Sequence, residues 1–390
     1  MEIKGANKQE LLSVWETNSL GELCQISAGG DLDKDDFSSY LTNTCFYPIF
    51  SNGLEGDGLY GYSAIAKNKA NAITITARGT VGFARFRSTK FTPIGRLLVL
   101  YPKSFIDAQY LSYFINERVS FVSETTGVPQ LTAPQASKYL VSYPPLKEQK
   151  AIAEALSDAD ALITSLEKLL NKKTLIYNTA LNELCVHQFE EVCQTKSLGE
   201  LFEITSSIRV HQKDWKDSGV PFLRTRELVK HHSGRGLNPK IFISEELFGQ
   251  LNKMNGSPKI GDLLVSGVGT IGIPFEVKST QKIYFKDANI IWLKNKGLVN
   301  ASFISFLFET SFLKNQILSK SIGTTVNTFT IDRAKKTYVF FPTIEKQKEV
   351  SNILFDMKVE IRATEDQLNK ARRVKEGMMQ KLLTGKTRLI

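Results

Sequence analysis

The segment "YPPLKEQKAIAEAL" at residues 143–156 returns 198 residues later as "FPTIEKQKEVSNIL" at residues 341–354. Two further pairs of segments recur in the same order, namely "SLGELCQIS" (19–27) with "SLGELFEIT" (197–205), and "RGTVG" (78–82) with "GVGTIG" (267–272). Three motifs repeated in one order indicate an internal duplication, which decides the architecture before any single element is assigned.

Each copy of the first motif opens a segment that predicts one long helix. Residues 148–184 contain neither Pro nor Gly, and apolar side chains recur at alternating steps of four and three, the spacing of a coiled coil. These side chains are Ile152, Leu156, Ala159, Ile163, Leu166, Leu170, Tyr177, Ala180 and Leu184, interrupted at Lys173. At about 1.5 Å per residue, such a helix is a rod roughly 55 Å long.

The second copy repeats this spacing without insertion or deletion. Shifting each position by 198 gives Val350, Leu354, Met357, Ile361, Thr364, Leu368, Lys375, Met378 and Leu382. Because both apolar edges share one register, we expect the two helices to pack against each other. The predicted packing residues are Ile152, Leu156, Ile163, Leu166, Leu170, Val350, Leu354, Met357, Ile361 and Leu368. The alternative is that each helix covers only its own globular domain.

The rest of the sequence predicts an α+β fold with two globular domains. Short apolar, β-branched runs such as "AITIT" and "NIIWLK" are typical of strands, and short helical patterns cover residues 108–118 and 301–318. The expected division is a first domain at residues 1–145, a long helix at 146–184, a second domain at 185–342, and a second long helix with a tail at 343–390.

Basic side chains are segregated along the chain. The 390 residues carry a net charge of +10, yet residues 1–145 hold 13 basic and 13 acidic side chains. Between Asp57 and Asp107 there are eight basic residues and no acid, and residues 209–240 hold eight basic residues against three acids. Such clusters suit contact with DNA phosphates, and arginine can also read guanine in the major groove. A solvated charged surface without a ligand is the alternative.

These clusters supply the predicted DNA contacts. In the first domain they are Lys67, Arg78, Arg85, Arg87 and Lys90. In the second domain they are Arg209, Lys213, Arg224, Arg226 and Arg235, with Asn327 as a further candidate.

Cysteine and histidine usage predicts neither a disulfide scaffold nor a metal site. The four cysteines are scattered, none lies in a C-x-x-C motif, and the four histidines have no zinc spacing. The opening residues lack a signal-peptide core, and the apolar run "FISFLF" is far shorter than the ~20 residues that cross a bilayer. We therefore expect a cytoplasmic protein without a membrane partner.

The "GVGTIG" segment matches the G-x-G-x-x-G pattern of dinucleotide-binding turns, which require a helix after the turn. Here "IPFEVKST" follows, with Pro274 and β-branched residues that predict a strand. The glycines therefore indicate a tight strand–turn–strand connection rather than a nucleotide site. Similarly, "YPPL" at residues 143–146 lacks the carboxamide and aromatic ring of an adenine-gripping loop, and its prolines are expected to end a strand.

One catalytic alternative remains. Asp262, Glu276 and Lys278 match the loose D…E-x-K pattern of metal-dependent nucleases, in which two carboxylates hold Mg²⁺. The corresponding positions in the first copy are Ala72, Phe86 and Ser88, so such a site would occur once. A scaffold built on the coiled coil, without a DNA ligand, is a third hypothesis.

Taken together, these motifs resemble the specificity subunit of type I restriction–modification systems. The resemblance covers essentially the whole chain and lies in the Leu-Gly-Glu-Leu openings, the Gly-Thr-x-Gly turns and the Pro-x-x-x-x-Gln entry to each helix. It implies that each globular domain is a target-recognition domain reading one half of a bipartite DNA site, and that the long helices pack antiparallel and set the gap.

The resemblance also implies the partners. The helices and their flanks would dock two methyltransferase subunits, which carry S-adenosylmethionine and methylate adenine at N6. A motor–nuclease restriction subunit would use ATP and Mg²⁺. This chain itself would then hold no cofactor and catalyse no reaction.

Overall fold

The computed structural model describes residues 15–121, 130–191, 193–318 and 328–389. The chain forms two compact units: residues 1–166 with 368–390, and residues 167–367. Each long helix therefore contributes one part to each unit. The predicted boundaries treat the two long helices as segments separate from the globular domains. In the structure, segments of both helices complete each globular head. Among the described residues, no helix is long and apolar enough to cross a membrane.

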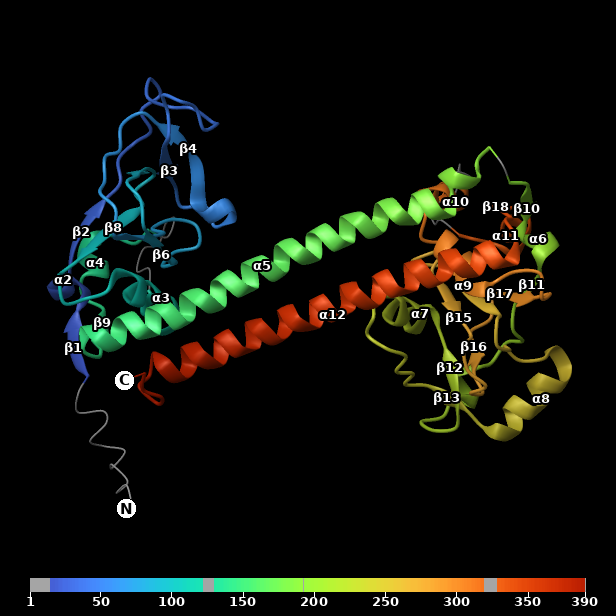
Figure 1. Cartoon of the computed structure of the whole chain (residues 1–390). Helices are drawn as coiled ribbons and strands as arrows, with labels where there is room; N and C mark the ends of the chain where they lie inside the picture. The colour runs from blue at the N-terminus through green and yellow to red at the C-terminus, as the bar shows by residue number, and fades with distance from the viewer. Residues whose placement is uncertain (1–14, 122–129, 192, 319–327, 390) are drawn as a thin grey trace, which may run out of the picture. The chain divides into compact units, whose positions relative to one another are not determined.

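The head of the first unit contains an antiparallel four-stranded sheet in the order β2-β8-β5-β6, a three-stranded sheet β4-β3-β7 and a two-stranded sheet β1-β9 (Figure 1). The strands are β1 Glu16–Ser19, β2 Cys24–Ala28, β3 Tyr47–Phe50, β4 Leu59–Ser63, β5 Ala72–Ile75, β6 Ala84–Arg87, β7 Thr92–Pro93, β8 Leu98–Pro102 and β9 Leu140–Tyr143. The helices of this part of the chain are α2 Leu20–Leu23, α3 Ala108–Arg118, α4 Ala133–Ala136 and the long α5 Leu146–Cys185.

The second unit repeats the plan, with sheets in the orders β11-β17-β14-β15, β13-β12-β16 and β10-β18. Its strands are β10 Thr195–Ser197, β11 Phe202–Thr205, β12 Val220–Leu223, β13 Phe242–Ile243, β14 Leu263–Ser266, β15 Pro274–Glu276, β16 Tyr284–Phe285, β17 Ile290–Asn295 and β18 Tyr338–Phe340. Its helices are α6 Leu198–Leu201, α7 Thr225–His232, α8 Glu245–Asn255, α9 Ala301–Leu307, α10 Ser311–Leu318, α11 Ile331–Lys335 and the long α12 Ile344–Leu382. The predicted α+β duplication is thus confirmed.

The Leu-Gly-Glu-Leu openings are structural. Ser19 and Ser197 each cap a one-turn helix, and Glu22 and Glu200 complete the two capping boxes by accepting hydrogen bonds from the cap residue's N–H. A Cβ on the glycine of either motif would lie 3.0 Å from the opposing segment, at Ser137 in the first copy. Glycine therefore lets the opposing backbone approach closely at this point in both units.

The first turn of each long helix contains a glutamine whose side chain is hydrogen-bonded to the start of a second helix. Gln149 is fully buried; its Oε1 accepts from the Asp107 N–H at 2.8 Å, and its Nε2 donates to the Pro144 carbonyl at 2.8 Å. Asp107 in turn caps α3 by accepting from the Tyr110 N–H. This explains the Pro-x-x-x-x-Gln motif: the amide joins the first turn of α5 to the cap of α3.

The second unit uses the same connection. Gln347 accepts from the Asn300 N–H at 2.8 Å and donates to the Pro342 carbonyl at 2.8 Å, and Asn300 caps α9. A side chain that pairs buried backbone groups satisfies hydrogen bonds that water cannot reach. The repeat therefore preserves a local hydrogen-bond arrangement as well as a fold.

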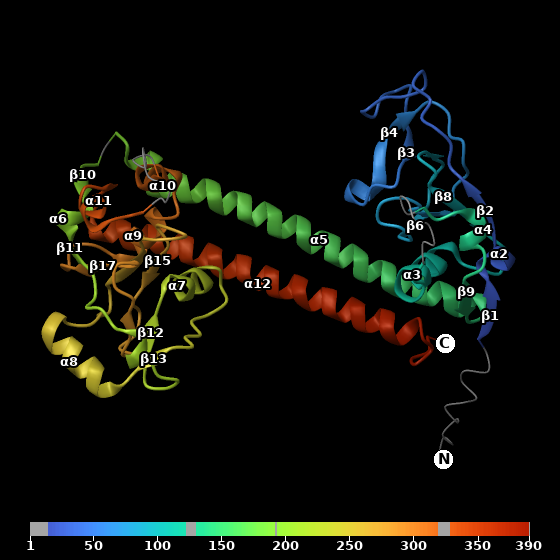
Figure 2. The same ribbon diagram turned by 180° about the vertical axis from the view of Figure 1, so that it is seen from behind.

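Within each unit, a segment of α5 lies beside a segment of α12, and the two run in opposite directions (Figures 1 and 2). In the first unit, Lys375 pairs with Asp160 at 2.5 Å. In the second unit, Lys173 pairs with Glu360 at 3.2 Å, and the Lys358 ammonium lies 5.6 Å from the Tyr177 ring centre. The expected antiparallel packing is confirmed, and separate helices on separate domains are not what the chain forms.

The helix segments also complete the cores of the heads. Ile152 and Leu156 pack in one cluster with Leu382 and Leu383, and Val350 and Leu354 pack in another with helix α5 residues such as Leu181. Full burial of an aliphatic side chain contributes roughly 1.5–3 kcal/mol. Ile152, Leu156, Val350, Leu354 and Leu368 are buried, whereas the remaining predicted packing residues are half-buried: Ile163, Leu166, Leu170, Met357 and Ile361.

Candidate nucleic-acid interface

Three of the predicted contacts in the first head are exposed cations. Lys67 follows β4, Arg78 lies at the Gly-Thr turn after β5, and Lys90 lies between β6 and β7. The Arg78 guanidinium donates from Nε and Nη2 to Gln130 Oε1, at 3.2 and 2.9 Å, which orients it while leaving the residue exposed. Lys67, Arg78 and Lys90 are therefore available to a phosphate.

Arg87 requires a correction. Its side chain is 3% exposed, its Nη1 lies 2.6 Å from Asp57 Oδ2, and its guanidinium lies 3.5 Å from the centre of the Phe50 ring. Desolvation lowers the pKa of Arg87 to about 10, although the Asp57 carboxylate opposes that shift. A guanidinium held in this way packs the head together and cannot reach DNA without leaving its partners.

Arg85 is only partly available for the same reason. Its side chain is 12% exposed, its Nε lies 3.0 Å from Asp57 Oδ1, and it donates to the Gly53 and Leu54 carbonyls. Arg85 and Arg87 thus share one carboxylate and fasten the 53–57 segment to β6. A direct contact of Arg85 with DNA would likewise require its side chain to leave these partners.

The second head carries exposed cations at Arg209, Lys213 and Arg235. Arg224 and Arg226 both bind Glu227, whose side chain is 3% exposed. Burial alone would raise the pKa of Glu227, but the hydrogen bonds from the two arginines outweigh it and lower the pKa. Arg226 remains half-exposed and can still face a ligand, whereas Arg224 mainly neutralises the buried carboxylate. Asn327 lies outside the described residues.

The glycine turns do not form nucleotide sites. Strand β14 leads into the "GVGTIG" turn and strand β15 follows it, so the chain continues from the turn as a strand and not as the helix that a dinucleotide-binding turn requires. Ser266 donates to the Thr270 carbonyl and accepts from the Ile273 N–H, while Gly269 and Gly272 have φ values of 78° and 75°. Thr76 makes the matching bonds in the first head, to Thr80 and Phe83. The predicted strand–turn–strand reading is confirmed.

The metal-nuclease alternative is wrong on geometry. Leu263 pairs with Glu276 in the β14–β15 ladder, so Asp262 and Glu276 project from opposite faces of the sheet, since side chains alternate along a strand. The Asp262 carboxylate accepts from the Trp292 Nε1–H, the Lys259 N–H and the Asn295 N–H. Among the residues that the structure describes, no group of three His, Cys, Asp or Glu side chains could hold a metal ion.

Glu276 and Lys278 have structural partners instead. The Glu276 carboxylate accepts from the Ser302 hydroxyl and lies 3.2 Å from Lys278 Nζ. Both residues line a cavity of about 620 Å³ between α7, α9 and α12, together with His231, His232 and others. Burial lowers the pKa of both histidines, which favours their neutral forms.

A family model described as the type I restriction modification DNA specificity domain matches this chain twice, at residues 13–174 and 190–372. The type I restriction enzyme MjaVIII specificity subunit of Methanocaldococcus jannaschii is 25% identical over 381 residues, which cover 88% of this chain and 87% of that protein. A putative type I specificity subunit of Mycoplasma pneumoniae is 31% identical over 164 residues, covering 40% of this chain and 49% of that protein. The chain thus matches about half the length of this second relative.

Solved structures share the fold. The S subunit of a type I restriction-modification system from M. genitalium matches with a TM-score of 0.65 at 15% identity, covering 94% of this chain and 96% of that chain. A structure described as the basis of complex assembly and conformational transition of the type I R-M system matches with a TM-score of 0.53 at 14% identity, covering 95% and 97%. At these identities the likeness concerns the fold.

Proposed function

This chain belongs to the type I restriction-modification DNA specificity family, and from that premise we propose that each head reads one half of a bipartite DNA target. One observation carries the proposal: the same sheet plan occurs twice, but its exposed cations differ, with Lys67, Arg78 and Lys90 on one head and Arg209, Lys213 and Arg235 on the other. Two heads with one framework and different surfaces suit two different half-sites.

The proposal extends to the partners that the family resemblance implies. Two methyltransferase subunits dock on the long helices and their flanks, and a motor–nuclease restriction subunit joins the assembly. S-adenosylmethionine, ATP and Mg²⁺ belong to those subunits, and this chain contributes recognition without catalysis. The four cysteines are free, which suits the reducing cytoplasm where we place the complex.

Hydroxyl-radical footprinting of the assembled complex on DNA that carries its methylation target tests the bipartite reading. We expect two protected segments separated by a stretch with weaker, sequence-independent protection, because bases are read at the heads and phosphates only position the protein. Sequencing of modified adenines in a host with the complete system supplies the target for this experiment. A single continuous recognition element would contradict the proposal.

Removing two exposed lysines of the first head is expected to weaken DNA binding. In the double variant Lys67→Ala/Lys90→Ala, the loss of two phosphate contacts makes the negative slope of log K against log [salt] shallower by about 1.8, since each contact contributes about 0.9. At moderate salt this corresponds to roughly tenfold weaker binding. Fluorescence anisotropy of a labelled duplex, titrated at several salt concentrations, measures both quantities.

The matched control removes two exposed lysines outside the basic cluster. Lys34→Ala/Lys138→Ala changes the net charge by the same amount, and both residues are exposed in the same head. If the two double variants lose the same salt slope, long-range charge and not local contact explains binding, and the assignment of Lys67 and Lys90 fails.

A further inference from the structure

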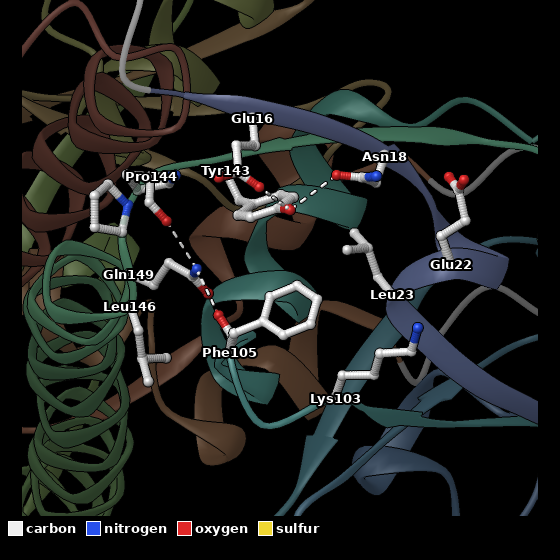
Figure 3. A pocket seen from close by; sticks show the side chains of 11 residues that line it. Glu16, Asn18, Glu22, Leu23, Lys103, Phe105, Tyr143, Pro144, Leu146 and Gln149 are labelled. Carbon is white, nitrogen blue, oxygen red and sulfur yellow. Dashed lines mark hydrogen bonds between the residues drawn. The ribbon is translucent and has the colours of Figure 1, made fainter.

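A pocket in the first unit lies where strands β1 and β9 meet the start of α5. Its volume is about 650 Å³, and its lining includes Glu16, Glu22, Lys103, Phe105 and Tyr143. Figure 3 shows the Glu16 and Asn18 side chains directed at the Tyr143 hydroxyl, with Phe105 and Lys103 also bordering the space. The pocket thus combines carboxylates, a phenol and apolar surface on one side of the head.

The polar groups of this pocket have unused hydrogen-bonding capacity. The Tyr143 oxygen lies 2.8 Å from Glu16 Oε2 and 2.8 Å from Asn18 Oδ1. A phenol carries one proton, so it satisfies one of these acceptors, and a carboxylate has about four lone-pair directions. Burial and the Glu16 carboxylate raise the pKa of Tyr143 to about 12, which keeps the phenol neutral. The pocket therefore offers acceptors to an incoming donor.

The internal repeat shows what occupies the equivalent position in the second unit. In the β10–β18 ladder Lys196 pairs with Val339, as Asn18 pairs with Val141, and the Phe341 N–H donates to the Gln194 carbonyl. Gln194, Lys196 and Phe341 thus correspond to Glu16, Asn18 and Tyr143. The Lys196 ammonium lies 4.2 Å from the centre of the Phe341 ring. In this copy the chain itself places a cation on the ring.

The charges of the two sites also differ. Lys296 corresponds to Lys103, and its Nζ donates to the Gly199 and Glu200 carbonyls at 3.1 Å each. Counting the charged side chains at the corresponding positions, the first site carries Glu16, Glu22 and Lys103, and the second carries Glu200, Lys196 and Lys296. The first site is therefore formally negative by one charge and the second positive by one.

An aromatic ring beside carboxylates is a recognition site for an ammonium or guanidinium group. DNA does not fit, because its phosphates would face a net negative charge. The volume exceeds that of one side chain, and the exposed Phe105 ring lines it, so the occupant is a basic residue with apolar neighbours. This describes a protein segment.

We propose that the pocket of the first unit receives a lysine or arginine side chain of a docked methyltransferase subunit, whereas the equivalent site of the second unit is filled by Lys196. The inference rests on the proposed function, in which methyltransferase subunits bind this chain. It makes the two docking events unequal: the first site depends on a partner cation and the second does not.

The test places a lysine in the first site, at the position that corresponds to Lys196 of the second site. In Asn18→Lys, the new ammonium reaches the Tyr143 ring and the Glu16 carboxylate, as Lys196 reaches Phe341, and closes the pocket. Isothermal titration of the full-length chain with the methyltransferase subunit of the same system should show one of two binding steps weakened at least tenfold. Melting of the free chain should be unchanged or higher, which shows that the variant folds.

Two further variants separate pocket filling from added charge. Thr17→Lys adds the same charge on the opposite face of β1, where the Thr17 hydroxyl meets Ser142, and should bind as wild type. Lys196→Asn empties the second site and should leave the other binding step within about twofold, because no partner cation is expected there. Glu16→Gln should weaken the first step roughly fivefold and reduce its salt dependence.

The outcomes distinguish this inference from the proposed function. Wild-type binding by Asn18→Lys at both steps would overturn the pocket assignment and leave the recognition role intact. Absence of any methyltransferase binding by the wild-type chain would overturn the docking role and the inference with it. Stabilisation of the wild type but not of Asn18→Lys by spermidine, with partner binding unaffected, would assign the pocket to a small cation and overturn the proposal.

Discussion

Replacing Arg388 by Ala should lower the free energy of unfolding of the first unit by about 3–5 kcal/mol, the cost of leaving a buried charge unpaired. Arg388 belongs to the tail after α12, and its Nε and Nη2 lie 2.6 and 2.5 Å from the two carboxylate oxygens of Glu148. The two side chains are 11% and 4% exposed. The hydrogen bonds that Arg388 donates to Glu148 raise the pKa of Arg388, so its guanidinium stays charged.

Differential scanning calorimetry measures this effect. For a unit of this size each kcal/mol shifts the melting temperature by about 2–4 °C, so the transition of the first unit should fall by roughly 10 °C. The double variant Glu148→Leu/Arg388→Leu is expected to restore the melting temperature of the first unit, because replacing a buried ion pair with apolar side chains is often neutral or stabilising. The double-mutant cycle isolates the pair from the loss of either side chain alone.

The repeat supplies a matched control for this prediction. Position 148 corresponds to Lys346 in the second copy, which pairs with Glu349 at 2.9 Å while both side chains remain more than a third exposed. Lys346→Ala should change stability by less than about 0.5 kcal/mol, because exposed pairs contribute little. Equal losses for Arg388→Ala and Lys346→Ala would mean that burial does not determine the strength of these pairs.

The long helices were predictable because their signal is periodic and local. The spacing of apolar residues from Ile152 to Leu184 requires only the geometry of a helix, and α5 spans Leu146–Cys185. The second helix and the mutual packing followed from the common register of the two copies. The duplicated α+β heads were predictable for the same reason, since their motifs recur in order.

The sequence did not indicate the structural roles of Arg85 and Arg87. The sequence shows eight basic residues after Asp57 without an intervening acid, which reads as an open cationic surface. In the folded head, Asp57 lies 3.0 Å from Arg85 and 2.6 Å from Arg87. Pairing and burial are long-range properties, and charge clustering along the chain does not reveal them.

The division of each helix between two units, and the pocket at Tyr143, were also missed. Leu382 and Leu383 pack with Ile152, from which they are separated by more than two hundred residues. The local sequence pattern of either segment does not identify the segment against which it packs. The pocket had a usable signal: comparison of the copies position by position sets Asn18 against Lys196 and Tyr143 against Phe341. The pocket is therefore indicated by the positions at which the aligned repeats differ, and not by the positions at which they are identical.

Gln149→Leu should destabilise the first unit by about 3 kcal/mol, because three backbone groups lose their bond to the buried Gln149 amide at about 1 kcal/mol or more each. These groups are the Asp107 N–H, the Pro144 carbonyl and the Phe105 carbonyl, at 2.8, 2.8 and 3.1 Å. Leucine has a similar volume, so the effect of hydrogen bonding is measured without a large cavity. Gln347→Leu removes the hydrogen bonds to the Asn300 N–H and the Pro342 carbonyl in the second unit, and its expected cost is about 2 kcal/mol.

The two variants should act on different units, which hydrogen exchange resolves. In Gln149→Leu, protection should fall at the start of α3 and α5, and in Gln347→Leu at the start of α9 and α12. The control is Gln380→Leu, an exposed position on α12, which should change stability by less than about 0.5 kcal/mol.

A glutamate at position 149 separates the acceptor role from the donor role. Gln149→Glu keeps an oxygen for the Asp107 N–H but loses the two amide hydrogens, and when ionised it buries a charge among carbonyl oxygens. Burial and these carbonyls raise the carboxyl pKa in the folded state, so the folded unit binds the proton more tightly than the unfolded chain, and stability rises as pH falls. Gln149→Glu should therefore be less stable than Gln149→Leu at pH 8 and recover toward pH 5. A loss of the same size at pH 5 and pH 8 would contradict this prediction, because it would show that a buried carboxylate charge at position 149 does not cause the loss.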